Sequence, residues 1–173
     1  DDIDRSQDDP EFNYYLDGGR ADEVCAFIET LKHVKGPWAK GGNNELRLEG
    51  WQCFLIVNIF GWLDNDTGFR RFLTVYIEVP RKNGKSILAA AIGLAMFVFD
   101  HEFGPEIYSG ATTEAQAWEV FRPARLMVAR NEAFAIEHGI QVNAKSLATI
   151  DDGGRFEPII GNPGASSDQK SQS

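Results

Sequence analysis

The chain has 173 residues, of which 43% are hydrophobic and 12% aromatic, a composition that excludes a disordered chain and fits one globular domain. Its longest apolar run, Ile87 to Phe99, is too short to cross a bilayer, and the acidic N-terminus shows no pattern of a secretory signal. The net charge is -9, but residues 1–23 contain nine acids and two bases and so hold -7 of it. The remainder is nearly balanced, so charge neither indicates nor excludes a nucleic-acid partner.

The first half of the chain predicts an acidic arm, two helices and a strand. Residues 1–19 form the arm, which we expect to be solvated or loosely docked. Apolar residues at helical spacing predict helices over 21–34 and 49–62. Alternating apolar and β-branched residues then predict a strand over 71–79.

The second half predicts a loop over 80–84, a helix over 85–99, a strand over 106–111 and a helix over 113–131 that Pro123 kinks or breaks. Strands over 146–151 and 155–160 are joined by a hairpin turn at Asp152-Gly153-Gly154. The order strand, helix, strand, helix predicts an α/β fold with a parallel sheet flanked by helices. We assign 20–173 to this domain.

Neither cysteine nor histidine usage indicates a metal site. Cys25 and Cys53 lie in helix-like, apolar segments, and we expect both to be reduced core thiols of a cytosolic protein. The three histidines lie far apart, without the spacing of metal ligands.

The segment between the predicted strand and helix has the pattern of a phosphate-binding loop. Its backbone N–H groups and the helix N-terminus can hold phosphates, and Gly84 permits close approach. Lys85 can reach the β- and γ-phosphates, and the Ser86 hydroxyl can bind Mg²⁺ of an ATP complex. The candidate nucleotide-binding residues of the loop are Pro80, Arg81, Lys82, Asn83, Gly84, Lys85 and Ser86.

The loop pattern is incomplete, because Val79 stands where the full motif has its first glycine. The predicted strand that runs into the loop and the apolar helix that starts at Lys85 favour a nucleotide-binding loop; a basic surface turn is the alternative. Arg81 is a candidate for stabilising the γ-phosphate in the transition state, whereas Lys82 reads as a solvated lysine.

Two further segments are candidates for the same site. Gln52 follows Trp51 at a helix start, and its amide could both donate to and accept from adenine; a capped helix start is the alternative. Small hydroxyl residues from Ser109 to Thr113 end the second strand, where α/β proteins bind ligands. Thr112 or Thr113 could equally be a plain helix N-cap.

A catalytic carboxylate pair is missing. Asp100 and Glu102 follow the helix that begins at the loop, so they point away from its phosphate end. Asp151 and Asp152 suit turn chemistry better. We therefore expect either a fragment of an ATPase or a chain that binds nucleotide without turning it over alone.

Several of these segments together resemble the large subunit of tailed-phage terminases, over about residues 23–164. They are Lys32 to Trp38, Leu48 to Gln52, Phe60 to Trp62, Arg70 to Phe72, Tyr76 to Ser86 and Tyr108 to Ala117. The family's loop commonly deviates at the first glycine, as here.

The resemblance implies a helicase-like (ASCE-type) P-loop NTPase domain, incomplete here, that drives double-stranded viral DNA into the capsid. It implies ATP and Mg²⁺ as ligands, Lys85 and Ser86 at the phosphates and metal, Gln52 at the adenine, and Arg81 as γ-phosphate sensor. The family also carries a nuclease domain, which has no counterpart in this sequence.

The implied partners are double-stranded DNA, a portal protein, a small terminase subunit and further copies of the chain in a ring, with no membrane. The implied location is the cytoplasm of an infected bacterium, transiently at the procapsid portal. Two alternatives stay open: another helicase-like DNA translocase, and a non-catalytic module that uses this fold to bind a protein.

Overall fold

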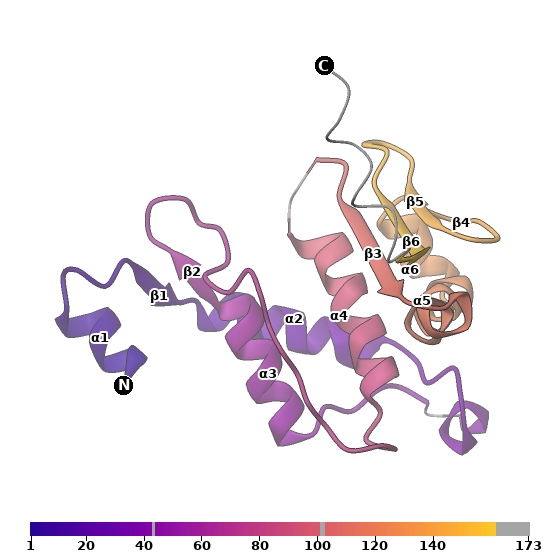
Figure 1. Cartoon of the computed structure of the whole chain (residues 1–173), viewed down its shortest axis with the longest axis horizontal. Coiled ribbons are helices and arrows are strands. Elements are labelled where there is room, and N and C mark those ends of the chain that lie inside the picture. Colours follow the sequence, from indigo (N-terminus) through magenta and orange to yellow (C-terminus); the bar gives the residue numbers. More distant parts are fainter. Residues whose placement is uncertain (43, 101–102, 162–173) are drawn as a thin grey trace, which may run out of the picture. The chain divides into compact units, whose positions relative to one another are not determined.

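The computed structural model describes residues 1–42, 44–100 and 103–161. The chain divides into two compact units, Asp1–Lys85 and Ser86–Ser173, which are described separately (Figure 1). None of the helices within the described ranges has the length and apolar character needed to cross a membrane.

Unit 1 is built on two packed helices, α2 (Gly18–Thr30) and α3 (Gly50–Gly61). Their apolar stripes meet in a core that includes Val24, Ile28, Ile56 and Phe60, all fully buried. The two predicted helices are therefore confirmed. Helix α2 begins earlier than predicted, at Gly18, and ends before Leu31. The Asp17 side chain caps its start by accepting a hydrogen bond from the Arg20 N–H. A short 3₁₀ helix, η1 (Pro37–Lys40), lies between them.

The acidic arm carries two short elements that the sequence pattern did not predict. They are α1 (Asp2–Asp8) and β1 (Tyr14–Leu16), and β1 pairs antiparallel with β2 (Trp62–Asp64). The three-residue strands are too short to show a clear alternation of burial, which is why sequence periodicity misses them.

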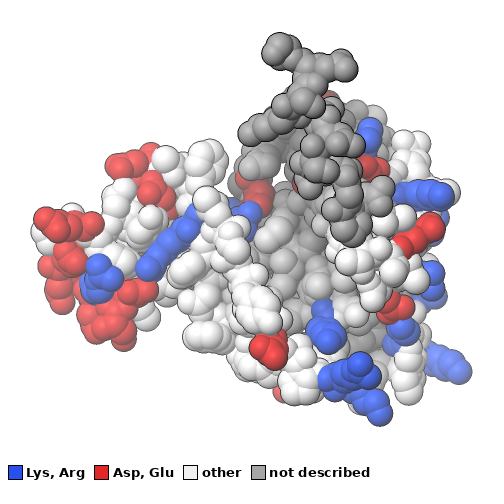
Figure 2. Space-filling model, viewed as in Figure 1, with Lys and Arg blue, Asp and Glu red and all other residues white. Residues whose placement is uncertain are grey.

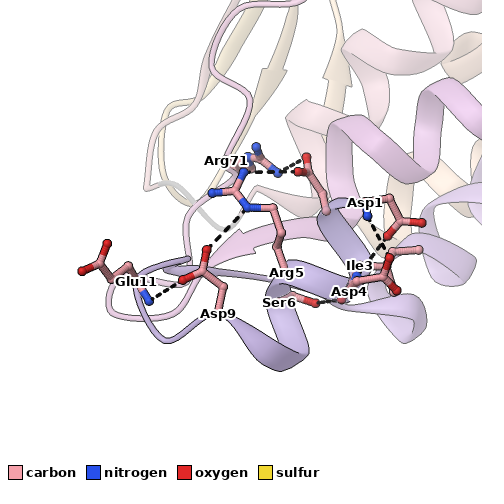
Figure 3. A network of polar contacts seen from close by, with 9 residues as sticks. Asp1, Ile3, Asp4, Arg5, Ser6, Asp9, Glu11 and Arg71 are labelled. Atoms are coloured by element: carbon pink, nitrogen blue, oxygen red, sulfur yellow. Dashed lines mark hydrogen bonds and ion pairs between the residues drawn. The ribbon is translucent and has the colours of Figure 1, made fainter.

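Arg71 fastens this arm to the rest of unit 1. Its guanidinium lies 2.8 Å from an Asp2 carboxylate oxygen, a pair drawn in Figure 3 among the polar contacts of α1. The guanidinium carbon also lies 4.8–5.5 Å from the centroids of four aromatic rings. These belong to Phe12, Tyr14, Trp62 and Phe72.

We expect Arg71→Ala to lower the free energy of unfolding by about 2 kcal/mol, since it removes several cation–π contacts around a largely buried guanidinium. Asp2→Asn is the matched control and should cost below about 1 kcal/mol, because Asp2 is 43% exposed and its pair is screened by water. Urea unfolding measures both. Limited proteolysis should also cut residues 1–16 faster in Arg71→Ala, and unchanged cleavage there would contradict the fastening role.

The two cysteines lie on the facing helices of unit 1. Both are free thiols, as predicted, but both are partly exposed, so the expectation of core positions is wrong. Burial, and secondarily the neighbouring Cys53, raise the pKa of the Cys25 thiol to about 11. Cys25 therefore stays protonated at neutral pH and is a poor nucleophile.

Unit 2 is a four-stranded sheet with helices packed on it. Strand β3 (Glu106–Ala111) pairs parallel with β6 (Arg155–Ile160), and the order continues through β5 (Leu147–Thr149) to β4 (Ile140–Val142). The helices are α4 (Lys85–Phe99), α5 (Glu114–Ala129) and α6 (Glu132–Glu137). The sheet is thus mixed. The predicted hairpin is confirmed in the antiparallel pair of β5 and β6, and β4, which was not predicted, adds a second antiparallel pair.

Helix α4 approaches the sheet at Gly93. A Cβ atom at this position would lie 2.9 Å from the ring of Phe156 on β6 and 3.8 Å from Ile107 on β3. The Phe156 ring also packs edge-on against Phe121 of α5. The absence of a side chain at Gly93 therefore allows this close approach of α4 to the sheet.

Two details of unit 2 differ from the sequence prediction. Helix α5 continues through Pro123 without a break, and α6 and β4 follow where no element was expected. The Arg125 side chain donates a 2.6 Å hydrogen bond to the Asn143 carbonyl, which ties α5 to the β4–β5 connection.

The predicted strand over 71–79 is absent: residues 74–80 lie in no helix or strand. Leu73 and Tyr76 are 84% and 86% exposed. A strand is stabilised by backbone hydrogen bonds from a neighbour, and no strand within the described residues pairs with this segment. The alternating pattern therefore reflects the strand propensity of these residues, but without a neighbouring strand they form no strand.

Candidate functional site: the loop before helix α4

The predicted phosphate loop is a turn that leads directly into α4. A turn at Arg81 and Lys82 is followed by bends at Asn83 and Gly84, and α4 begins at Lys85, the residue predicted from sequence. The Asn83 side-chain amide donates a 3.4 Å hydrogen bond to the Pro80 carbonyl and closes the turn. Backbone N–H groups of the first helical turn lack partners within a helix, so this end suits an anion.

The loop backbone is left-handed at two residues. Gly84 has φ +69°, a conformation open to glycine, and Lys82 has φ 72°, which is rare for a residue with a side chain. Alternation of handedness along a turn directs successive N–H groups to one side, which is the geometry of an anion-binding nest. Lys82 is the one described non-glycine residue with positive φ, so the strain is concentrated in the candidate site.

The space around the loop is open. Arg81, Lys82, Asn83, Gly84 and Lys85 are exposed, and no atom lies within 4 Å of a Cβ placed on Gly84. Pro80 is exposed as well, and Ser86 is half-buried at the helix end of the turn. The loop therefore presents three cationic side chains, a free backbone turn and a hydroxyl to a ligand, and these groups fit a polyphosphate with its metal ion.

Gln52, the candidate adenine contact, lies in the first turn of α3. Its side-chain oxygen accepts a 2.8 Å hydrogen bond from the Glu49 N–H, which caps the helix. The cap leaves the amide N–H₂ group available as a donor. No hydrogen bond joins Gln52 to the loop in the described part of the chain, so its contact with a nucleotide stays a prediction.

At the end of β3, the residues singled out from sequence act as caps and packing groups. The Thr113 hydroxyl accepts from the Gln116 N–H at 3.3 Å as the N-cap of α5. The Thr112 hydroxyl donates a 3.0 Å hydrogen bond to the side-chain oxygen of Gln116. The buried Ser109 hydroxyl donates one of 2.7 Å to the Ala117 carbonyl. The capping alternative for Thr113 is thus confirmed.

Asp152 is a turn residue, as predicted, and not a catalytic carboxylate. It accepts hydrogen bonds from the Thr149 hydroxyl and from the N–H groups of Gly154 and Gly104. These bonds, led by that of Thr149, hold the pKa of the Asp152 carboxyl below its usual value. Glu102 and Asn162-Pro163-Gly164 lie outside the described residues.

A cavity of about 320 Å³ in unit 2 lies at the other end of α4. Phe97 and Val98 line it together with His138 and Asp152. Twelve helical residues separate Phe97 from Lys85, about 18 Å along the axis, so this cavity is not part of the loop site.

A nest-like loop with Gly-Lys-Ser that leads into a helix, the packing of that helix on a sheet and the parallel pair of β3 and β6 are features of an α/β protein of the P-loop NTPase class. The sequence model of the family "Terminase large subunit, ATPase domain" matches residues 50–172. The chain belongs to this family.

A structural comparison agrees. The crystal structure of the HK97 bacteriophage large terminase matches with a TM-score of 0.63 and 27% sequence identity over 82% of this chain. The match covers 27% of the HK97 chain, so the present chain spans about a quarter of that protein's length. No curated protein sequence matches significantly.

Proposed function

We propose that this chain is the nucleotide-binding part of an ATP-driven motor that moves double-stranded viral DNA into a capsid. The loop from Pro80 to Ser86 carries the proposal, because its backbone geometry, its cations and its position at the start of α4 suit a nucleotide polyphosphate. Membership of the terminase ATPase family and the likeness to the HK97 large terminase support the link to DNA packaging.

In this proposal each loop residue has a separate task. The backbone N–H groups of the turn and of the first turn of α4 bind the β- and γ-phosphates, and Lys85 neutralises their charge. The Ser86 hydroxyl binds Mg²⁺, which screens the phosphates and orients them for transfer. Arg81 lies at the exposed side of the turn and can stabilise charge that develops on the γ-phosphate.

The proposed base contact is Gln52. Its N–H₂ group can donate to a ring nitrogen of adenine while its oxygen holds the helix cap at Glu49. Because the amide oxygen caps α3 while the N–H₂ group contacts the base, we predict that the adenine contact depends on an intact N-terminus of α3. The wider setting of the motor comprises DNA, a portal protein, a small terminase subunit and a ring of identical subunits, acting in the infected bacterial cell.

Calorimetry with a non-hydrolysable ATP analogue tests the nucleotide site. We expect the chain to bind the analogue with Mg²⁺ and to bind it at least about tenfold more weakly when EDTA removes the metal, because charge on the phosphates is then unscreened. The GTP analogue should bind more weakly than the ATP analogue if Gln52 reads the base. A folded chain that binds neither analogue at millimolar concentration would refute the site.

A further inference from the structure

We propose that the loop over residues 32–42 is a contact surface for the backbone of duplex DNA, with Lys35 and Lys40 at phosphates and the Trp38 ring against the sugars. The proposal rests on the packaging role proposed above and adds to it a particular part of unit 1. Its evidence is the charge, exposure and anchoring of this loop.

The loop is locally basic in an acidic chain, as is the loop before α4. Residues 32–42 contain three lysines and no acid, and the exposed Glu45 follows, although the whole chain carries a net charge of -9. Lys35 and Lys40 are exposed and Lys32 is half-buried. Burial lowers the pKa of His33, so the imidazole is neutral at pH 7 and the lysines supply the positive charge.

The opposite end of unit 1 has the opposite charge. The arm and α1 precede α2, whereas the loop follows it, and the thirteen residues of α2 span about 20 Å. Figure 2 shows acidic side chains crowded over the end that carries α1. A polyanion such as DNA would thus be repelled from the arm and attracted to the loop.

The loop is anchored rather than loose. Its two sides are joined by a hydrogen bond of 2.6 Å from the His33 N–H to the Asn44 carbonyl and by one of 2.7 Å from the Leu46 N–H to the Leu31 carbonyl. Leu31, Val34 and Leu46 are buried below it. A surface that is already ordered loses little entropy when it binds, so this anchoring favours a binding role.

The loop also exposes a large aromatic ring. Trp38 is 73% exposed on η1, and its ring lies 6.4 Å from that of His33, tilted by 33°. Attraction to an acidic protein would need only the lysines. The flat indole between two lysines also offers an apolar face to the sugars of a duplex. Because a neutral ring contact has no sequence preference, we expect binding that does not depend on base sequence.

Salt-dependent binding to a mixed-sequence DNA duplex, followed by fluorescence anisotropy of a labelled duplex, tests this proposal. Each lysine that neutralises a phosphate contributes about 0.9 to the slope of log K against log salt. Replacing Lys35 and Lys40 together by alanine should therefore lower the slope by about 1.8. The matched control changes two exposed cations of unit 2, Arg130→Ala with Lys145→Ala, and should leave the slope unchanged.

Trp38 provides a second, charge-neutral readout. We expect Trp38→Ala to weaken duplex binding about fivefold with no change in the salt slope, because a neutral aromatic contact contributes affinity but releases no counterion. Equal loss of slope in the control variant, or full affinity in Trp38→Ala, would overturn the proposal. Competition by polyglutamate as strong as that by DNA would also overturn it, in favour of an acidic protein partner.

Binding of the ATP analogue, measured on the same variants, separates this proposal from the nucleotide site. The loop variants should bind the analogue like the unaltered chain. Weaker analogue binding in Trp38→Ala with unchanged DNA binding would place the ring at the nucleotide and overturn the DNA contact. The two proposals can also fail separately. If the loop variants lose DNA binding but the unaltered chain binds no nucleotide, the DNA contact of the loop is supported and the nucleotide site is refuted.

Discussion

Replacing Lys85 by alanine should weaken binding of the Mg²⁺–ATP analogue by about 100-fold. A hydrogen bond from a charged donor contributes about 1.5–3 kcal/mol, and the contact with two phosphates places Lys85 at the upper end of that range. The side chain is exposed in the structure, so its loss removes a ligand contact without disturbing a core. Calorimetry gives the affinity directly, and circular dichroism checks that α4 is intact.

Lys82→Ala is the matched control for this change. Lys82 and Lys85 carry the same charge, are both exposed and lie three residues apart. If the loop were only a basic turn that attracts polyphosphates, the two substitutions would weaken binding equally. We expect instead that Lys82→Ala changes affinity less than about threefold, since general attraction between exposed charges is worth below about 1 kcal/mol. Equal effects would refute the assigned role of Lys85.

Whether an element could be predicted from the sequence depends on whether local patterns or long-range pairing stabilise it. Helices α3 and α4 and strand β3 lie where periodicity and turn residues predicted them, because their patterns are long and locally consistent. Strands β1 and β2 have three residues each and exist because they pair with one another across 45 or more intervening residues. No local pattern contains such a pairing.

The segment over 71–79 shows the converse case. Its alternation predicts a strand, and the structure leaves it without one, since pairing requires a neighbour that the described residues do not offer. The βαβ rule predicted a parallel pair of the 71–79 segment with β3, and that pair is absent; β3 instead pairs parallel with β6, which is distant in sequence. The hairpin of β5 and β6, which depends only on the local turn at residues 152–154, was predicted.

The candidate site divides in the same way. The start of α4 at Lys85 and the glycine turn could be predicted from Gly84-Lys85-Ser86, because a loop of this kind is local in sequence. The capped helix start, which the sequence offers as the alternative for Gln52, is confirmed by the hydrogen bond from the Glu49 N–H. The left-handed backbone of Lys82 could not be predicted, since residue type does not fix it. The capped amide of Gln52 matters most here, because it limits which atoms of that side chain remain for a base.

Gly93→Val should lower the free energy of unfolding by about 3 kcal/mol, the upper part of the usual range for overpacking a core. A Cβ would lie 2.9 and 3.0 Å from two ring atoms of Phe156, closer than atoms in proteins normally approach. Phe156 is 1% exposed and packs edge-on against Phe121, so its ring has no free space to enter. Helix α4 must therefore shift away from the sheet, and urea unfolding measures the loss.

A double-mutant cycle with Phe156→Leu identifies the clash as the cause. Phe156→Leu alone should be destabilising because it leaves a cavity, but in the Gly93→Val background the smaller side chain also relieves the overlap. We therefore expect the double variant to be more stable than the sum of the single changes by about 1–2 kcal/mol. Gly50→Ala is the control for helix propensity, since no atom lies within 4 Å of its Cβ position, and it should be neutral or stabilising. Strict additivity in the cycle would show that Gly93 is retained for another reason than the contact between α4 and β6.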